Sequence, residues 1–204
     1  MNELQIEDKI VAAFERLSEV FRVLSWKMAR EFGLSPLQIK LLIFLNNHDP
    51  SKCNISYLSK EFSLSKATVS DAVFALETKG FVKKITNASD ARSHFLTVTE
   101  NGKTLTAELS KFTIPFRQII EELQEKEKVM LWNLLQKIIF ESNRSGLISI
   151  QRMCMNCRFY EKRKSRHYCN LLKKRLLISE IRVDCPDFVE VEQPQMPMLH
   201  VQTS

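Results

Sequence analysis

The feature that most constrains this fold is an order of four segments in the first half of the chain. Two short segments with apolar residues at helical spacing, 54–62 and 65–79, are separated by a brief break. Two runs rich in β-branched and aromatic residues follow at 81–85 and 94–98. Two short helices joined by a tight turn form a helix-turn-helix, whose second helix enters the DNA major groove. Because a β-hairpin directly after that helix is a wing, the sequence predicts a winged helix-turn-helix.

Long amphipathic segments flank this motif. Apolar residues recur at intervals of three and four over 4–32 and again over 99–143. Ser35 and Gln38 are placed to form a capping box for a further helix at 36–47. Only four glycines occur in 204 residues, which disfavours β-sandwiches and glycine-rich nucleotide-binding folds. The expected fold class is therefore mainly α with a small β-wing.

Glycine, proline and threonine mark the predicted ends of the helices. Three of the four glycines directly follow a helical segment: Gly33, Gly80 and Gly146. Pro115 predicts a kink or break within the apolar pattern that surrounds it, and Thr99 can cap the helix after the second β-prone run. The polar stretch 86–93 between the two β-prone runs is too long for a two-residue hairpin turn.

Three motifs occur in a fixed order within this region. They are Ser65-Lys66-Ala67-Thr68-Val69-Ser70 with Leu76-Glu77-Thr78-Lys79-Gly80-Phe81-Val82, then Asp90-Ala91-Arg92-Ser93, then Leu96-Thr97-Val98-Thr99-Glu100-Asn101-Gly102. Together they resemble the recognition helix, the wing tip and the following helix start of the MarR family over roughly residues 4–143. The resemblance implies a homodimer clasped by its terminal helices, with two winged domains that read a palindromic operator in double-stranded DNA. The apolar stripes of the terminal helices suit such a clasp, although an intramolecular core would leave the same stripes.

The candidate DNA-contacting residues are Ser65, Lys66, Thr68, Ser70, Lys83, Lys84 and Arg92. Hydroxyl and ammonium groups can bond to base edges or phosphates, and a guanidinium suits the negative minor groove. As alternatives, Ser65 could only cap its helix, Arg92 could pair with Asp90, and the two wing lysines could form a solvated edge. Asp71 and Ala91 stand where the family often carries arginine, which leaves the operator preference open. Three apolar residues of the second helix are expected to pack inward: Val69, Val73 and Leu76.

Charge changes sharply late in the chain. The formal net charge is +6, yet 151–185 alone carries 10 basic and 3 acidic side chains, while the first 150 residues carry 20 basic and 18 acidic ones. This change predicts three parts: a winged-helix and dimerisation domain at 1–146, a cysteine-rich extension at 147–188 and a flexible tail at 189–204.

Four of the five cysteines lie in the extension with the spacing Cys-x2-Cys-x11-Cys-x15-Cys; they are Cys154, Cys157, Cys169 and Cys185. The polar N-terminus has no signal-peptide core, which predicts a cytoplasmic protein, and disulfide frameworks are rare in that compartment. Two thiolates in one turn and two distant ones can complete a four-thiolate metal shell. One close pair, two lone cysteines and a final proline favour an iron–sulfur cluster as the cofactor, with zinc as the alternative. A disulfide pair or free thiols also remain open.

Two further residues have less specific interpretations. His167 could replace a cysteine as a ligand, but a surface position or one beside the site is the preferred interpretation. Cys53 stands alone before the helix-turn-helix and is expected to be a buried thiol, with a redox sensor as the alternative.

The leading hypothesis is a homodimeric transcriptional regulator whose DNA affinity depends on the cysteine site. With an iron–sulfur cluster the protein would respond to oxygen, iron or redox stress, whereas with zinc the extension would be a structural brace. A winged-helix module that binds protein is the alternative hypothesis, because the first 150 residues carry almost no net charge.

Enzymatic activity is not expected, since the sequence has no glycine-rich phosphate loop, no nucleophile–histidine arrangement and no parallel-sheet pattern for a redox pair. No apolar run approaches the ~20 residues of a membrane span, so no membrane partner is expected. A small-molecule effector cannot be identified from the sequence.

Overall fold

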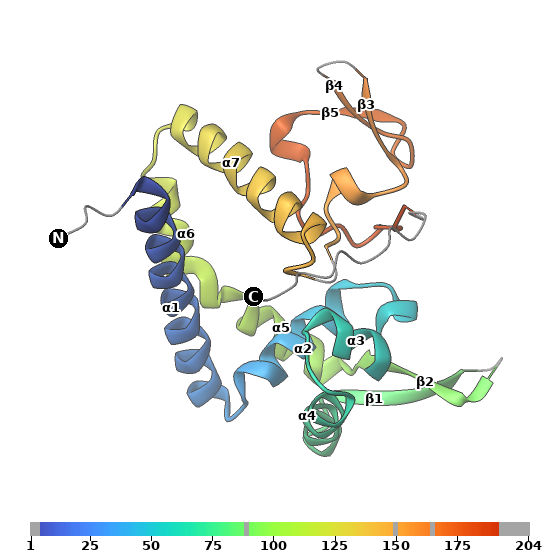
Figure 1. Ribbon diagram of the computed structural model, residues 1–204. Helices are drawn as coiled ribbons and strands as arrows, with labels where there is room; N and C mark the ends of the chain where they lie inside the picture. Colours follow the sequence, from blue (N-terminus) through green and yellow to red (C-terminus); the bar gives the residue numbers. More distant parts are fainter. Residues whose placement is uncertain (1–4, 88–89, 149–150, 164–165, 192–204) are drawn as a thin grey trace, which may run out of the picture. The chain divides into compact units, whose positions relative to one another are not determined.

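The computed structural model describes residues 5–87, 90–148, 151–163 and 166–191, with the backbone alone over 87 and 90–93 (Figure 1). The chain divides into two compact units, Met1–Gln124 and Glu125–Ser204. The predicted boundary at residue 146 lies inside the second unit.

The first unit contains the predicted helix-turn-helix and wing, in the predicted order. Its elements are α1 (Ile6–Phe32), α2 (Pro36–Asn47), η1 (Pro50–Lys52), α3 (Ile55–Glu61), α4 (Lys66–Thr78), β1 (Val82–Asn87), β2 (Asp90–Val98), α5 (Glu100–Leu109), η2 (Ser110–Thr113) and α6 (Ile114–Glu121). The expectation of a mainly helical fold with a small β-wing is confirmed.

Local signals set the helix ends, as expected. The hydroxyl of Ser35 accepts a hydrogen bond from the Gln38 backbone N–H at 3.2 Å, and the Gln38 side chain accepts one from the Ser35 N–H at 2.9 Å. Gly33 follows α1 with φ 62°, a left-handed conformation that glycine adopts without a steric penalty. Pro115 lies in the first turn of α6, so the predicted break in the pattern is confirmed.

The wing differs from its prediction. Strands β1 and β2 are antiparallel and pair from Val82 with Val98 to Thr86 with His94, and after a register shift Asn87 pairs with Asp90. The polar stretch 86–93, which was predicted to lie between the two strands, belongs mostly to the strands themselves. Residues 91–93 of β2 lie between these two pairs without partners in β1, so the pairing is irregular there although the strands continue to residues 87 and 90.

The core of the first unit lies between the helix-turn-helix, the wing base and the neighbouring helices. Its fully buried side chains include Ile39, Leu41, Leu42, Leu58, Val69, Val73, Leu76 and Leu109. By contrast, α1 buries only Ser25 and Ala29, and much of its predicted apolar stripe remains exposed. Phe21 of that stripe contacts Phe116 of α6, with ring centroids 4.8 Å apart. In one chain, α1 thus covers only part of its apolar surface.

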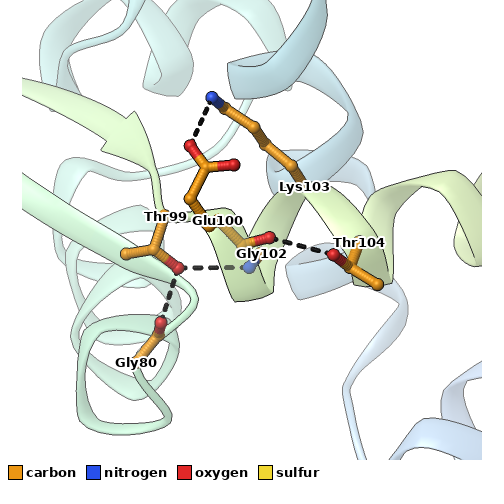
Figure 2. Close-up of polar contacts among 6 residues, drawn as sticks. All are labelled: Gly80, Thr99, Glu100, Gly102, Lys103 and Thr104. Carbon is orange, nitrogen blue, oxygen red and sulfur yellow. Dashed lines mark hydrogen bonds and ion pairs between the residues drawn. The ribbon is translucent and has the colours of Figure 1, made fainter.

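One polar junction connects the end of α4, the end of the wing and the start of α5 (Figure 2). The Thr99 hydroxyl donates to the Gly80 carbonyl at 2.7 Å and accepts from the Gly102 N–H at 3.1 Å. The Thr99 N–H donates to the carbonyl of Phe81 at 3.0 Å. A Cβ on Gly102 would lie 2.2 Å from that same carbonyl oxygen, so only glycine allows this close approach. The junction sets where the wing and α5 leave the recognition helix.

The second unit consists of one long helix and a small sheet. Its elements are α7 (Glu125–Arg144), η3 (Cys154–Asn156), β3 (Tyr160–Arg163), β4 (Arg166–Cys169), β5 (Lys174–Leu176) and η4 (Ile178–Glu180). The strands form an antiparallel sheet in the order β3–β4–β5. The indole N–H of Trp132 donates to the carbonyl of Ile178 at 3.0 Å, and the Asn156 side chain donates to Asn143 at 2.7 Å. These bonds attach the cysteine segment to α7.

Residues at the start of the predicted tail belong to this unit. The Arg158 N–H donates to the Val189 carbonyl at 2.9 Å, and Cys157 forms an antiparallel bridge with Glu190. Residues 192–204 of that tail lie outside the described residues. Among the helices that the structure describes, none combines the length and the apolar character needed to cross a membrane.

Replacement of Gly102 by alanine should destabilise the first unit by about 1–3 kcal/mol, because the new methyl group overlaps the Phe81 carbonyl. Urea unfolding monitored by circular dichroism measures the loss. Asn101→Ala, one residue earlier on the exposed side of α5, is the matched control and should change stability by less than about 0.5 kcal/mol. Equal stability of the two variants would contradict the close approach.

Candidate nucleic-acid interface and metal centre

Helix α4 has one face in the core and one face exposed. Val69, Val73 and Leu76 are buried, as expected, and hold the helix against the rest of the first unit. Lys66 and Ser70, one helical turn apart, lie on the exposed side. The exposed face is thus rigidly supported from behind, which is what a helix needs to enter a groove.

The hydroxyls of Ser65 and Thr68 are partly used within the helix itself. Ser65 Oγ accepts from the Thr68 N–H at 3.1 Å and lies 2.8 Å from Thr68 Oγ1. Ser65 is the N-cap of α4, so the capping interpretation of this residue is correct. Both side chains are exposed and retain further hydrogen-bonding capacity.

Two exposed residues of α4 were given no DNA-contacting role by the sequence analysis. Phe74 is 67% exposed and lies one turn beyond Ser70. Asp71 is exposed on the same side of the helix. The exposure of Phe74 could have been predicted from the sequence. At helical spacing it lies on a different face of the helix from Val73 and Leu76, which are buried.

The wing lysines differ in their surroundings. Lys84 Nζ lies 2.6 Å from Glu77 Oε2, so this ammonium connects β1 to α4. Lys83 is exposed and pairs in the sheet with Thr97. Arg92 lies on β2, but its side chain is outside the described residues, as is that of Asp90.

In the second unit, the four predicted ligand cysteines line one cavity of about 40 Å³. None of them forms a disulfide; Cys157 is buried, while Cys154, Cys169 and Cys185 are partly buried. The sequence prediction that these distant residues gather is consistent with this arrangement. The carboxylate of Glu180, which also lines the cavity, accepts hydrogen bonds from Lys174 and from the Leu177 N–H.

Backbone pairing brings the two lone cysteines to the close pair. The Cys154 N–H donates to the Arg182 carbonyl and the Cys185 N–H donates to the Arg152 carbonyl, each at 2.9 Å. Cys169, at the end of β4, is the sheet partner of Tyr160. The guanidinium of Arg152 is buried and lies 2.7 Å from the Asp184 carboxylate, which further fixes the loop before Cys185.

The surroundings of Cys154 reflect the proximity of the other thiols. Burial raises the pKa of the Cys154 thiol, the backbone N–H of Arg182 lowers it, and the other three cysteines raise it further. That N–H donates to Cys154 Sγ at 3.3 Å. His167 instead lies 2.6 Å from the Tyr160 hydroxyl through its Nδ1, beside the cavity. The interpretation of His167 as a residue beside the site agrees with this contact.

Comparison with known proteins decides the family of the first unit. The MarR family model matches residues 32–93. An uncharacterized HTH-type transcriptional regulator, YxaD of Bacillus subtilis (strain 168), is 31% identical over 99 residues, which are 48% of this chain and 68% of YxaD. The chain belongs to the MarR family.

Two other similarities extend the family assignment. The HTH-type transcriptional regulator BilQ of Clostridioides difficile (strain CD3) is 25% identical over 126 residues, 60% of this chain and 84% of BilQ. The S. aureus MepR–DNA complex shares the fold with a TM-score of 0.57 and 19% identity, over 68% of this chain and 99% of MepR. About a third of this MarR-family chain therefore has no counterpart in MepR.

Cys53 of this MarR-family chain is a structural thiol of the helix-turn-helix. It is buried, its Sγ lies 3.4 Å from the Asp49 carbonyl oxygen, and its own carbonyl accepts from the Leu96 N–H at 2.7 Å. Burial and the nearby Asp49 carboxylate raise the pKa of Cys53 to about 11. Because the thiolate is the reactive form, this geometry disfavours a redox role for Cys53.

Native Cys53 should therefore resist alkylation by iodoacetamide at pH 8, where its thiol stays protonated. In denaturant, where the pKa returns to ~8.5, the same thiol should react readily. Peptide mapping by mass spectrometry measures both reactions residue by residue. Rapid modification of Cys53 in the folded chain would contradict the structural role.

Proposed function

We propose that this chain is a sequence-specific regulator that binds palindromic operators in double-stranded DNA as a homodimer. The observation that carries the proposal is the division of α4 into a buried apolar face and an exposed polar face, directly before a wing. MepR, whose fold this unit shares, has been solved as a complex with DNA. A rigid helix with exposed hydroxyl and ammonium groups suits the major groove.

Each exposed group has a distinct role in this proposal. Lys66 and Ser70 bond to base edges or phosphates, and the ring of Phe74 contacts a thymine methyl group. Asp71 repels phosphate, so it is expected to accept a hydrogen bond from a cytosine amino group. Together these residues would give the helix its base preference.

The wing would supply contacts that do not depend on sequence. Arg92 enters the minor groove, where negative potential favours a guanidinium. Lys83 contacts a phosphate, whereas Lys84 holds the wing against α4 through Glu77. Such phosphate contacts make binding strongly dependent on salt.

The exposed stripe of α1 supports the homodimer. Ile6, Ile10, Phe14 and Leu17 recur at helical spacing and are all exposed in the single chain. Contiguous apolar surface of this kind is typical of protein interfaces. A two-fold dimer would place two identical winged units on the two halves of a palindrome.

The four-cysteine cavity is proposed to be a metal site that makes DNA affinity responsive to iron or redox conditions. Its segment is bonded to α7 through Trp132 and Asn143, so a change in the site acts on a terminal helix of the family fold. Metal binding in such a small segment is expected to be coupled to its folding. A structural zinc brace without a regulatory effect is the alternative.

Replacement of Arg92 by alanine should weaken binding to all duplexes about 5- to 50-fold, because it removes a contact that carries little sequence information. Lys66→Ala should instead change the preferred base at one operator position by about 1–3 kcal/mol. Fluorescence anisotropy with an operator selected from random duplexes, at several salt concentrations, measures both effects.

The control for these variants is Lys111→Ala, which removes an exposed lysine that is paired with Glu108 outside the helix-turn-helix. Its affinity should equal that of the wild type. Unchanged affinity of Arg92→Ala would exclude the wing contact, and absence of any salt dependence would favour a protein-binding module.

Phe14→Glu should convert the homodimer into monomers, because two buried carboxylates would face each other across the interface. Sedimentation velocity gives the mass, and affinity for a palindrome should fall to that for a half-site. Glu15→Gln changes the adjacent exposed position and should remain dimeric. A dimeric Phe14→Glu variant would place the interface elsewhere.

A further inference from the structure

The four cysteines of the second unit surround a space. They line a cavity of about 40 Å³, whereas one water molecule requires about 10–15 Å³ on a comparable measure. Among the residues that the structure describes, no group of three or more Cys, His, Asp or Glu side chains is arranged to hold a metal ion. The four thiols therefore border one shared space.

The two metal chemistries require different arrangements of the thiols. A structural zinc ion requires four sulfurs each about 2.3 Å from a single centre, in a closed tetrahedron. In a cluster the thiolates bind separate iron ions, and bridging sulfides fill the space between them. One close pair and two separate cysteines on the walls of one cavity favour the second arrangement.

The walls of the cavity also suit a cluster. Phe159, Tyr160, Leu172 and Leu176 contribute apolar side chains around the sulfurs, which limits access of water. The Arg182 N–H donates to Cys154 Sγ, and hydrogen bonds to ligand sulfurs are among the factors that set cluster potentials. The excess of basic residues in this segment offsets the negative charge of four thiolates.

The segment has little else to stabilise it. Over the described part of 147–191, the buried apolar residues are few: Met153, Cys157, Leu176, Ile181 and Phe188. A module of about 40 residues with so small a core usually depends on metals or disulfides. Since its thiols are free, a cofactor that binds all three cysteine-bearing segments of the chain at once supplies the missing constraint.

We propose that this cavity binds an iron–sulfur cluster through Cys154, Cys157, Cys169 and Cys185. The inference rests on the proposed function in one respect, since it specifies the cofactor of the proposed metal site. Each thiol releases its proton to solvent as its sulfur binds iron. Binding of the cluster would link Cys169 and Cys185 to the pair Cys154 and Cys157. It would thereby order the segment against α7.

The test is to purify the full chain without oxygen and to supply it with iron salt and sulfide, or with zinc alone. The expected product is brown, absorbs visible light, and contains two or four iron ions with an equal number of sulfides per chain. The visible absorption should fall on chemical reduction. A colourless chain that takes one zinc ion and no sulfide would overturn the proposal.

Alanine variants of the four cysteines assign the ligands. Each should lose at least fivefold of the bound iron and sulfide, while Cys53→Ala, a cysteine of the first unit, should retain them. Circular dichroism of α-helix content checks that the variants remain folded. Full loading of Cys169→Ala or Cys185→Ala would overturn the four-cysteine ligand set.

Operator binding by the same samples separates this inference from the proposed function. A regulatory cluster should change operator affinity at least fivefold between the loaded and cluster-free chain. Salt-dependent operator binding by a chain that takes no cluster would reject the inference and retain the DNA-binding function. A chain that binds the cluster but no operator would support the inference and reject the DNA-binding function.

Discussion

The geometry of the first unit depends on the junction of Thr99, Gly80 and Gly102. The Thr99 hydroxyl joins the Gly80 carbonyl, after the recognition helix, to the Gly102 N–H in the first turn of α5. Because Gly102 lacks a Cβ, the backbone at Phe81 can pass directly over the start of α5. The wing begins at that crossing, so its direction relative to α4 follows from a few backbone contacts. Lys84 and Glu77 add a second connection between the same two elements.

The second unit is organised on a different principle. Its small sheet and short turns have little apolar core, and its backbone hydrogen bonds bring cysteine residues from distant positions to one cavity. Such a module gains order when a cofactor crosslinks those positions. Two side-chain hydrogen bonds, from Trp132 and to Asn143, attach this segment to α7, the long helix of the same unit.

Much of the helical fold was predictable because helix ends are decided locally. Ser35 with Gln38, the left-handed glycines and Pro115 act within a few residues of their own position, and the structure contains each as expected. The wing was less predictable. Its strands extend through the polar stretch because cross-strand pairing outweighs weak intrinsic β-preference, and pairing is not a local property.

The sequence by itself determined the helix-turn-helix, the inward face of α4 and the grouping of four cysteines by spacing. Only the tertiary structure decided which charged side chains are paired and which aromatic side chains are exposed. It placed Lys84 against Glu77 and left Phe74 exposed. It also determined that the four thiols line one cavity. Periodicity specifies which face of a helix is apolar, but distances between residues far apart in the chain arise only when the elements pack.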